Sequence, residues 1–218
     1  MKYRHVVFIV ILILVIDQTL KFWIKTHMFM QQEFVIIPNW FRIHFIENEG
    51  MAYGLKFGGD FGKILLTLFR LAAVVVGFVY MKRLVKEKYS TGLLICGSLI
   101  LAGAAGNLID SMFYGLIFND SIGYEVAKFM PSGGGYGSFL HGRVVDMLYF
   151  PIYEGYLPKW IPFKGGDYFV FFRPVFNVAD AAISTGVIAI LVFQKRFFGK
   201  HAHHNKEVEP PVAKDPAV

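Results

Sequence analysis

Charged residues are scarce in this sequence. Asp, Glu, Lys and Arg make up only 17% of the 218 residues, whereas a typical soluble domain contains about a quarter. The hydrophobic residues, 55% of the chain, occur in long blocks, which indicates an integral membrane protein. The net charge of +6 fits basic loops on one side of a membrane. No basic tract is interleaved with aromatic residues, so the sequence predicts no nucleic-acid partner.

The sequence also lacks the motifs that are typical of several kinds of enzyme and of disulfide-bonded proteins. Cys96, the single cysteine, lies in an apolar block, so it forms no intrachain disulfide and is expected to be a buried small side chain. The chain contains no Gly-x-Ser-x-Gly elbow, His-Glu-x-x-His pair or phosphate-binding loop. Serine and zinc hydrolysis therefore lose support, and we expect neither a metal nor a cofactor. His201, His203 and His204 could bind a metal, but a solvated tail explains them better.

Four apolar blocks approach the length of about 20 residues that a helix needs to cross a membrane. They cover residues 6–24, 64–81, 92–110 and 176–194. The first block follows two basic residues, as in a secretory signal peptide. However, Asp17 and Gln18 lie where small cleavage-site residues should be, so we interpret this block as a retained span.

The basic residues predict the orientation of these spans. They are Lys2 and Arg4 before the first block, Lys82, Arg83, Lys86 and Lys88 between the second and third, and Lys195, Arg196 and Lys200 after the fourth. Because cytoplasmic loops carry the excess of Lys and Arg, both termini are predicted to be cytoplasmic. Residues 201–218 are expected to form a disordered cytoplasmic tail.

Two long loops, residues 25–63 and 111–175, should then face the outside. Apolar and polar residues alternate over part of the run 40–46, which predicts a half-exposed strand in a small sheet on the membrane surface. The second loop is rich in glycine and in aromatic residues, which suit a membrane interface.

Ionisable residues inside membrane spans are costly and are therefore functional candidates. Asp17 and Lys21 are four residues apart on one helix face and can pair, which favours a structural or site-supporting role. Asn107 and Asp110 also share a face. Asp110 is expected to end its helix, where the dipole disfavours a negative charge, so it needs an arginine, a backbone donor or a proton.

Asn177 and Asp180 repeat this spacing at the start of the fourth span. Spacing alone leaves helix capping and catalysis equally open for them. Asp146 stands in an apolar run without a capping pattern, and Arg143 could be an ordinary solvated or headgroup-facing charge. Two carboxyl groups held close together share one proton, so that one activates water while the other polarises a carbonyl. Such a pair could support aspartic peptidase chemistry, which requires no metal.

Five segments in this order resemble the motifs of bacterial lipoprotein signal peptidase, also called signal peptidase II, over residues 6–195. They are Asp17-Gln18-Thr19-Leu20-Lys21, Asn48-Glu49-Gly50-Met51-Ala52-Tyr53-Gly54, Gly103-Ala104-Ala105-Gly106-Asn107-Leu108-Ile109-Asp110, Val144-Val145-Asp146 and Phe176-Asn177-Val178-Ala179-Asp180. The resemblance implies a single membrane-embedded peptidase domain, residues 1–200, with four transmembrane helices and an extracytoplasmic β-cradle.

The resemblance also implies an activity. It is the removal of signal peptides from diacylglyceryl-modified prolipoproteins, by cleavage before the lipidated cysteine at the outer side of the bacterial inner membrane. Globomycin-type inhibition is implied as well. The catalytic dyad falls on Asp146 and Asp180. The residues implied to line, support or brace the site are Asn48, Gly50, Asn107, Asp110, Asn177, Asp17 and Lys21. Membrane lipids are expected partners, and a monomer is adequate for this chemistry.

The sequence departs from the family pattern in two ways. Ser111 stands where the family usually has arginine, and Arg143 is a candidate to supply the missing charge. Insertions also lengthen the chain between Gly115 and Val144 and between Asp146 and Asn177. Two other functions remain open: a small proton-coupled transporter, and a non-catalytic scaffold whose acids only cap helices. The absence of an inverted repeat and of a helix broken at mid-span disfavours transport.

Overall fold

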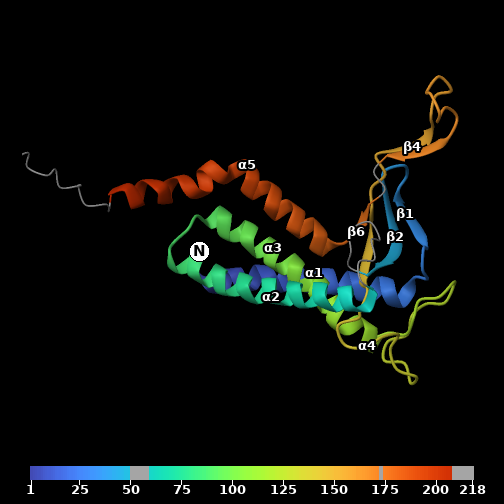
Figure 1. The fold of residues 1–218 in the computed structure, drawn as a ribbon, viewed down its shortest axis with the longest axis horizontal. Coiled ribbons are helices and arrows are strands. Elements are labelled where there is room, and N and C mark those ends of the chain that lie inside the picture. Colours follow the sequence, from blue (N-terminus) through green and yellow to red (C-terminus); the bar gives the residue numbers. More distant parts are fainter. Residues whose placement is uncertain (50–58, 172–173, 208–218) are drawn as a thin grey trace, which may run out of the picture.

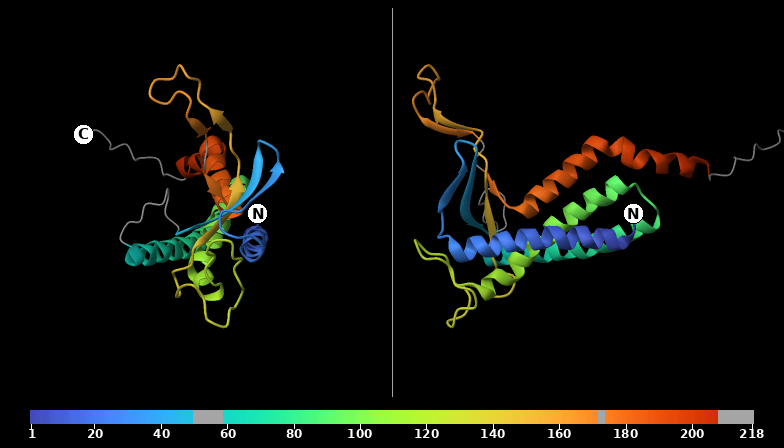
Figure 2. Two further views of the ribbon diagram at one scale, coloured as in Figure 1. Left: turned by 90° about the vertical axis from the view of Figure 1, so that its right-hand side faces the viewer. Right: turned by 180° about the vertical axis from the view of Figure 1, so that it is seen from behind.

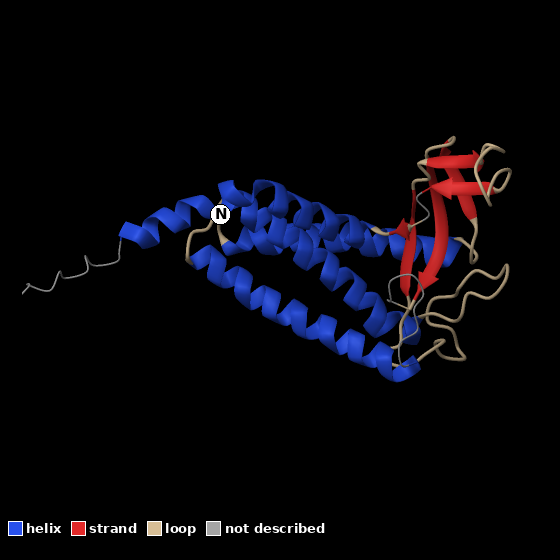
Figure 3. Cartoon of the chain, turned by 45° about the horizontal axis from the view of Figure 1, so that its top comes forward, coloured by secondary structure: helices blue, strands red, loops and turns tan. Residues whose placement is uncertain are grey.

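The computed structural model describes residues 1–49, 59–171 and 174–207, which form four long helices with two small sheets at one end (Figure 1; Figure 3). The long helices are α1 (Tyr3–His27), α2 (Gly59–Lys86), α3 (Thr91–Ile109) and α5 (Val178–Glu207). Each contains a segment long and apolar enough to cross a membrane, which confirms the four predicted spans. The chain is therefore a multi-pass membrane protein.

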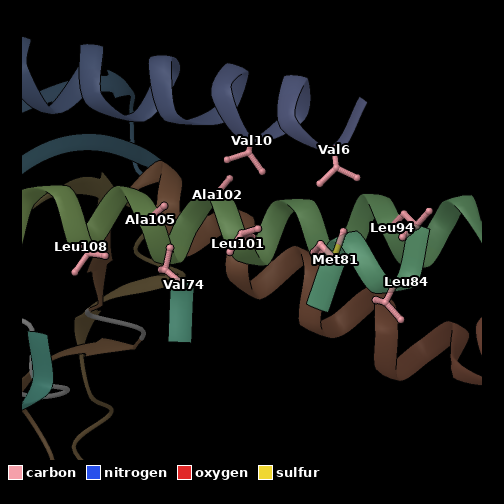
Figure 4. Packing of buried hydrophobic residues seen from close by; sticks show 10 residues of the cluster. All are labelled: Val6, Val10, Val74, Met81, Leu84, Leu94, Leu101, Ala102, Ala105 and Leu108. Atoms are coloured by element: carbon pink, nitrogen blue, oxygen red, sulfur yellow. The ribbon is translucent and has the colours of Figure 1, made fainter. Parts of the chain in front are cut away.

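Helix α3 is the central helix of the bundle. Most of its residues are buried, whereas most residues of the other spans face outwards. Val6 and Val10 of α1 and Val74 of α2 pack with Leu101 and Ala102 of α3 in one apolar cluster (Figure 4). Because lipid is as apolar as these side chains, such helices associate through close packing.

The α-helix α3 ends at Ile109 with Asp110 as its C-cap, as expected, but helical structure continues beyond it to Ile117. A π-helical turn, η2 (Asp110–Tyr114), follows α3 and leads into the short α4 (Gly115–Ile117). In a π turn each backbone hydrogen bond spans one residue more than in an α-helix, which widens the helix, and such turns often occur at functional sites. Hydrophobic periodicity does not encode it, because the apolar pattern continues on both sides.

The larger sheet stands at one end of the helices (Figure 2). It contains β1 (Glu33–Ile37), β2 (Phe41–Asn48), β3 (Val144–Tyr149) and β6 (Val175–Phe176), in the antiparallel order β1-β2-β3-β6. The strand expected within residues 40–46 is thereby confirmed as β2. Strand β3 is an inner strand and almost wholly buried, so Asp146 at its middle is enclosed. In the sheet, Asp146 lies opposite Ile46 of β2.

The insertion between Asp146 and Asn177 forms a separate hairpin beside the larger sheet (Figure 2). Its strands are β4 (Tyr153–Tyr156) and β5 (Tyr168–Phe171). Tyr156, Trp160 and Phe163 are exposed on this hairpin and its loop.

The amino terminus and the far end of α5 both lie at the end of the helices that is remote from the sheets (Figure 1). Helix α5 bends at Phe193 and continues to Glu207, so residues 201–207 of the expected tail are helical. Residues 208–218 lie outside the described part of the chain.

Candidate active site

The polar site begins at the first turn of α5, where the helices meet the larger sheet. The backbone N–H of Asp180 donates to Oδ1 of Asn177 at 2.9 Å, and the backbone N–H of Asn177 donates to Oδ2 of Asp180 at 3.3 Å. These reciprocal bonds form a capping box that satisfies two backbone donors at the helix start. Asn177 and Asp180 therefore cap the helix as their spacing suggested. The cap also fixes the direction in which the Asp180 carboxylate points.

Asp146 faces this cap from strand β3. Its carboxylate Oδ1 accepts a hydrogen bond from Nδ2 of Asn177 at 2.6 Å, and the residue is only 3% exposed. Burial, and then the negative charge of Asp180, raise the pKa of Asp146 to about 7, although hydrogen bonds from Asn177 and Asn48 act in the opposite direction. Asp146 is thus suited to carry a proton near neutral pH.

Asn107 of α3 completes a chain of amides between the two acids. Its Nδ2 donates to Oδ1 of Asp180 at 2.7 Å, and its Oδ1 accepts from Nδ2 of Asn177 at 3.1 Å. Asp146 and Asp180 are therefore linked through Asn177 and Asn107. The structure brings both acids of the expected dyad into one hydrogen-bonded group.

Lys21 anchors this group from α1. Its ammonium lies 2.9 Å from Oδ2 of Asp17 and 2.8 Å from Oδ2 of Asp110, and it donates to Oδ1 of Asn107 at 2.9 Å. Gln18 donates to both of these acids as well. Lys21, Asp17 and Asp110 are almost fully buried, so each charge depends on the others for compensation. The expected pairing of Asp17 with Lys21 is confirmed.

Asp17 and Asp110 also hold the two elements that carry the dyad. Oδ1 of Asp17 accepts from the backbone N–H of Ala179 in the first turn of α5 at 2.9 Å. Oδ2 of Asp110 accepts from the backbone N–H of Val145 on β3 at 3.3 Å. The partners that Asp110 needed are therefore an ammonium group, an amide and a backbone donor.

Arg143, the candidate to supply a charge near Ser111, pairs with two acids of other elements. Its Nη1 lies 2.7 Å from Oδ1 of Asp120 and 3.1 Å from Oε2 of Glu47. Lys25 also pairs with Glu47. Arg143 thus belongs to a second charged cluster that ties the first inserted loop to α1 and β2. Both partners are acids, which hold the guanidinium there.

The guanidinium beside Ser111 comes from Arg70 of α2 instead. Its Nη1 donates to Oγ of Ser111 at 3.4 Å. The sequence did carry a signal for this residue, because an arginine within an apolar span is a functional candidate. We missed it because Arg70 stands alone, outside every motif segment.

The remaining expected positions are Asn48 and Gly50. Asn48, the last residue of β2, hydrogen-bonds to Asp146. Gly50 lies outside the described residues. Within the described ranges, no three His, Cys, Asp or Glu side chains are grouped so that they could hold a metal ion.

Comparisons with known proteins identify the family of this chain. The family model described as Signal peptidase (SPase) II matches residues 9–196. A protein of Porphyromonas gingivalis named lipoprotein signal peptidase is 50% identical over 189 residues, which cover 86% of this chain and 81% of that protein. A protein of the same name from Amoebophilus asiaticus is 42% identical over 191 residues, which cover 86% of this chain and 76% of its relative.

Two solved structures, both described as bacterial membrane enzymes, share the fold. One has a TM-score of 0.54 at 23% identity and covers 98% of this chain and 94% of its own. The other has a TM-score of 0.53 at 25% identity and covers 86% of this chain and 90% of its own. The family model and the two named relatives each match most of the sequence. The chain belongs to the signal peptidase II family of membrane aspartic peptidases.

Proposed function

We propose that this protein removes the signal peptide from diacylglyceryl-modified prolipoproteins by cleaving before the lipidated cysteine, with Asp146 and Asp180 as the catalytic dyad. The observation that carries the proposal is the linkage of these two acids through the amides of Asn177 and Asn107. One chain contributes both acids, so a monomer suffices. Globomycin-type inhibitors are expected to block the site.

The two acids lie in different environments, which favours different protonation states. Burial and the charge of Asp180 raise the pKa of Asp146 to about 7, so Asp146 is the proton carrier. Asp180 accepts hydrogen bonds from Asn107 and from the backbone of Asn177, at the positive end of the α5 dipole. These donors stabilise a carboxylate, so Asp180 is the ionised partner.

Peptide hydrolysis then proceeds by general acid–base catalysis. Asp180 takes a proton from a water molecule while the water oxygen forms a bond to the scissile carbonyl carbon. Asp146 donates its proton to the carbonyl oxygen, which gives a neutral tetrahedral diol. When the C–N bond breaks, the proton on Asp180 passes to the departing nitrogen. A diol proton returns to Asp146, so the dyad is restored and one water is consumed.

The position of the site suits a substrate anchored in a membrane. Asp180 lies in the first turn of a span, and Asp146 lies on the sheet at the same end of the helices. The opposite end of the helices carries basic residues, including Lys2, Arg4 and Lys86. The bias of Lys and Arg towards the cytoplasm therefore favours cytoplasmic termini and a site at the outer face of the bacterial inner membrane.

Neither alternative function gains support. The matching family model and the named relatives are peptidases, so the transporter interpretation is not supported. The scaffold interpretation requires the acids only to cap helices. Capping explains Asp180, but Asp146 lies within a strand, where it has no helix to cap.

The test is cleavage of a lipidated precursor by the purified protein in detergent. Asp146→Asn and Asp180→Asn should each abolish cleavage while the variants still extract from membranes and unfold cooperatively. Full activity of either variant would exclude that residue from the dyad. A precursor without the diacylglyceryl group should be cut poorly, and equal cleavage of both precursors would exclude recognition of the lipid.

A further inference from the structure

Arg70 is a charged residue that the reaction described above does not use. It lies in the transmembrane segment of α2, where an ionisable side chain is costly unless it faces the bundle interior and finds partners. Its side chain does face inwards: Nη1 reaches Oγ of Ser111 at 3.4 Å. Asp180, Asp110 and Asp146 all attract its charge.

Thr67 holds this part of α2 in place. Thr67 is 2% exposed, and its hydroxyl lies 2.9 Å from the carbonyl oxygen of Lys63 and 3.4 Å from that of Leu140. The second contact joins α2 to the first inserted loop. Because Arg70 lies three residues after Thr67, the two side chains share one helix face, which is the face turned towards the site.

The hydroxyl of Ser111 connects Arg70 to the dyad. It donates a hydrogen bond to the backbone carbonyl oxygen of Asn107 at 2.9 Å, and it accepts a hydrogen bond from Nη1 of Arg70. The side-chain amide of the same Asn107 donates to Oδ1 of Asp180 at 2.7 Å. Three hydrogen bonds, joined through the covalent bonds between the backbone and the side chain of Asn107, thus connect the guanidinium to one acid of the dyad.

The acids of the site carry more negative charge than Lys21 alone can neutralise, which gives the Arg70 guanidinium a role. Lys21 is shared between Asp17 and Asp110, so these three residues have a formal charge of −1 when both acids are ionised. A dyad with one shared proton carries another negative charge. Arg70 opposes this surplus.

We propose that Arg70 is the positioning residue of the dyad: through Ser111 and Asn107 it orients Asp180, and its charge keeps one dyad carboxyl ionised at neutral pH. This inference rests on the proposed function, because it assigns Arg70 a task only if the dyad is catalytic. Among the residues that the structure describes, the charged side chains placed around the dyad include Asp17 and Lys21 from α1, Arg70 from α2 and Asp110 from η2.

The experiment measures kcat and KM for a lipidated precursor as a function of pH. Arg70→Ala should lower kcat about tenfold or more at neutral pH with little change in KM. Since a nearby cation favours the charged carboxylate, its loss should move the acid limb of the kcat profile up by about one pH unit. Arg70→Lys should retain much of the activity and shift the limb less. Arg83→Ala is the matched control, because Arg83 lies on the same helix but is exposed and paired with Glu87.

Moving the positive charge to another residue gives a test that does not depend on whether Arg70→Ala folds. In the double variant Arg70→Ala/Ser111→Arg, the guanidinium approaches the same space from η2, so activity and the acid limb should recover towards the wild type. If Arg70→Ala does not fold, Arg70→Gln, which keeps the length of the side chain but not its charge, takes its place. An unchanged pH profile in the neutral variant that folds would overturn the inference. Activity of Asp146→Asn or Asp180→Asn would instead overturn the dyad itself, so the two failures are distinguishable.

Discussion

Asn177 and Asp146 are joined by a hydrogen bond of 2.6 Å from the amide Nδ2 to the carboxylate Oδ1. The same asparagine caps α5 through its Oδ1, which accepts from the backbone N–H of Asp180. One side chain thus sets both the start of the helix that carries Asp180 and the orientation of the acid on β3. The capping and catalytic explanations of this motif, which the sequence left open, are compatible.

The two tasks of Asn177 can be separated by substitution. Asn177→Ser keeps a good capping residue but loses the amide donor to Asp146, whereas Asn177→Ala loses both. A hydrogen bond to a neutral group contributes about 0.5–1.5 kcal/mol, so kcat should fall about 2- to 10-fold in both variants. The melting temperature in detergent should fall further in Asn177→Ala than in Asn177→Ser, because only alanine also removes the helix cap. An Asn177→Ser variant with wild-type kcat would show that the amide bond is unimportant for catalysis.

The raised pKa of Asp146 predicts how activity depends on pH. With a pKa of about 7, Asp146 loses its proton as the pH rises through neutrality, so kcat/KM should fall on the alkaline side. The hydrogen bond from Asn48 lowers this pKa, so Asn48→Ala should move the alkaline limb to higher pH. Initial cleavage rates from about pH 5 to 9 would test both statements. Activity that stays constant up to pH 9 would contradict the assignment of Asp146 as the proton donor.

The raised pKa of Asp146 also means that this residue lowers the free energy of unfolding at neutral pH. Its pKa is about 7 in the folded protein, well above the ordinary value of an aspartate, so the folded state binds a proton more tightly than the unfolded state. The free energy of unfolding therefore decreases as the pH rises from about 4 to 7, by a few kcal/mol. Asp146→Asn cannot ionise, so it should be inactive but more stable than the wild type above pH 7. The gain should disappear at low pH, and unfolding in detergent at two pH values would measure it.

The sequence predicted the parts of this site that depend on local spacing. The pair Asp17–Lys21 and the cap Asn177–Asp180 follow from helix periodicity, and both appear in the structure. The alternating run within residues 40–46 likewise predicted strand β2. In each case, the interacting residues are close in sequence or repeat at a fixed period.

Features that depend on tertiary structure were missed. The π turn from Asp110 to Tyr114 leaves the apolar pattern unchanged, so hydrophobic periodicity could not predict it. Arg143 precedes Asp146 closely in sequence, yet two acids hold it in another cluster, while Arg70 approaches Ser111 from a different helix. Spacing along the chain carries no information about which of two distant arginines lies beside a given serine.

Lys21 should be indispensable for folding. Its ammonium is fully buried between Asp17 and Asp110, so Lys21→Met would leave two buried carboxylates without a counter-ion. Breaking such a cluster costs about 3–5 kcal/mol. The variant should therefore show a strongly lowered melting temperature in detergent. In the triple variant with Asp17→Asn and Asp110→Asn the unpaired charges are absent, so much of the stability should return. A stable Lys21→Met single variant would contradict this electrostatic account.

Gly103 should be intolerant of even a methyl group. A Cβ atom at this position of α3 would lie 2.1 Å from the carbonyl oxygen of Ala179 and 2.7 Å from Cγ1 of Ile183, both on α5. The backbone contact cannot be relieved by a side-chain rotation, so Gly103→Ala must displace the first turn of α5 and the Asp180 carboxylate with it. We expect a loss of about 1–3 kcal/mol in stability and a larger proportional loss in kcat than in substrate binding. Gly133→Ala is the control, since a Cβ there meets no atom within 4 Å. If Gly103→Ala cleaves a lipidated precursor as fast as Gly133→Ala, the close contact of α3 with α5 does not position the dyad.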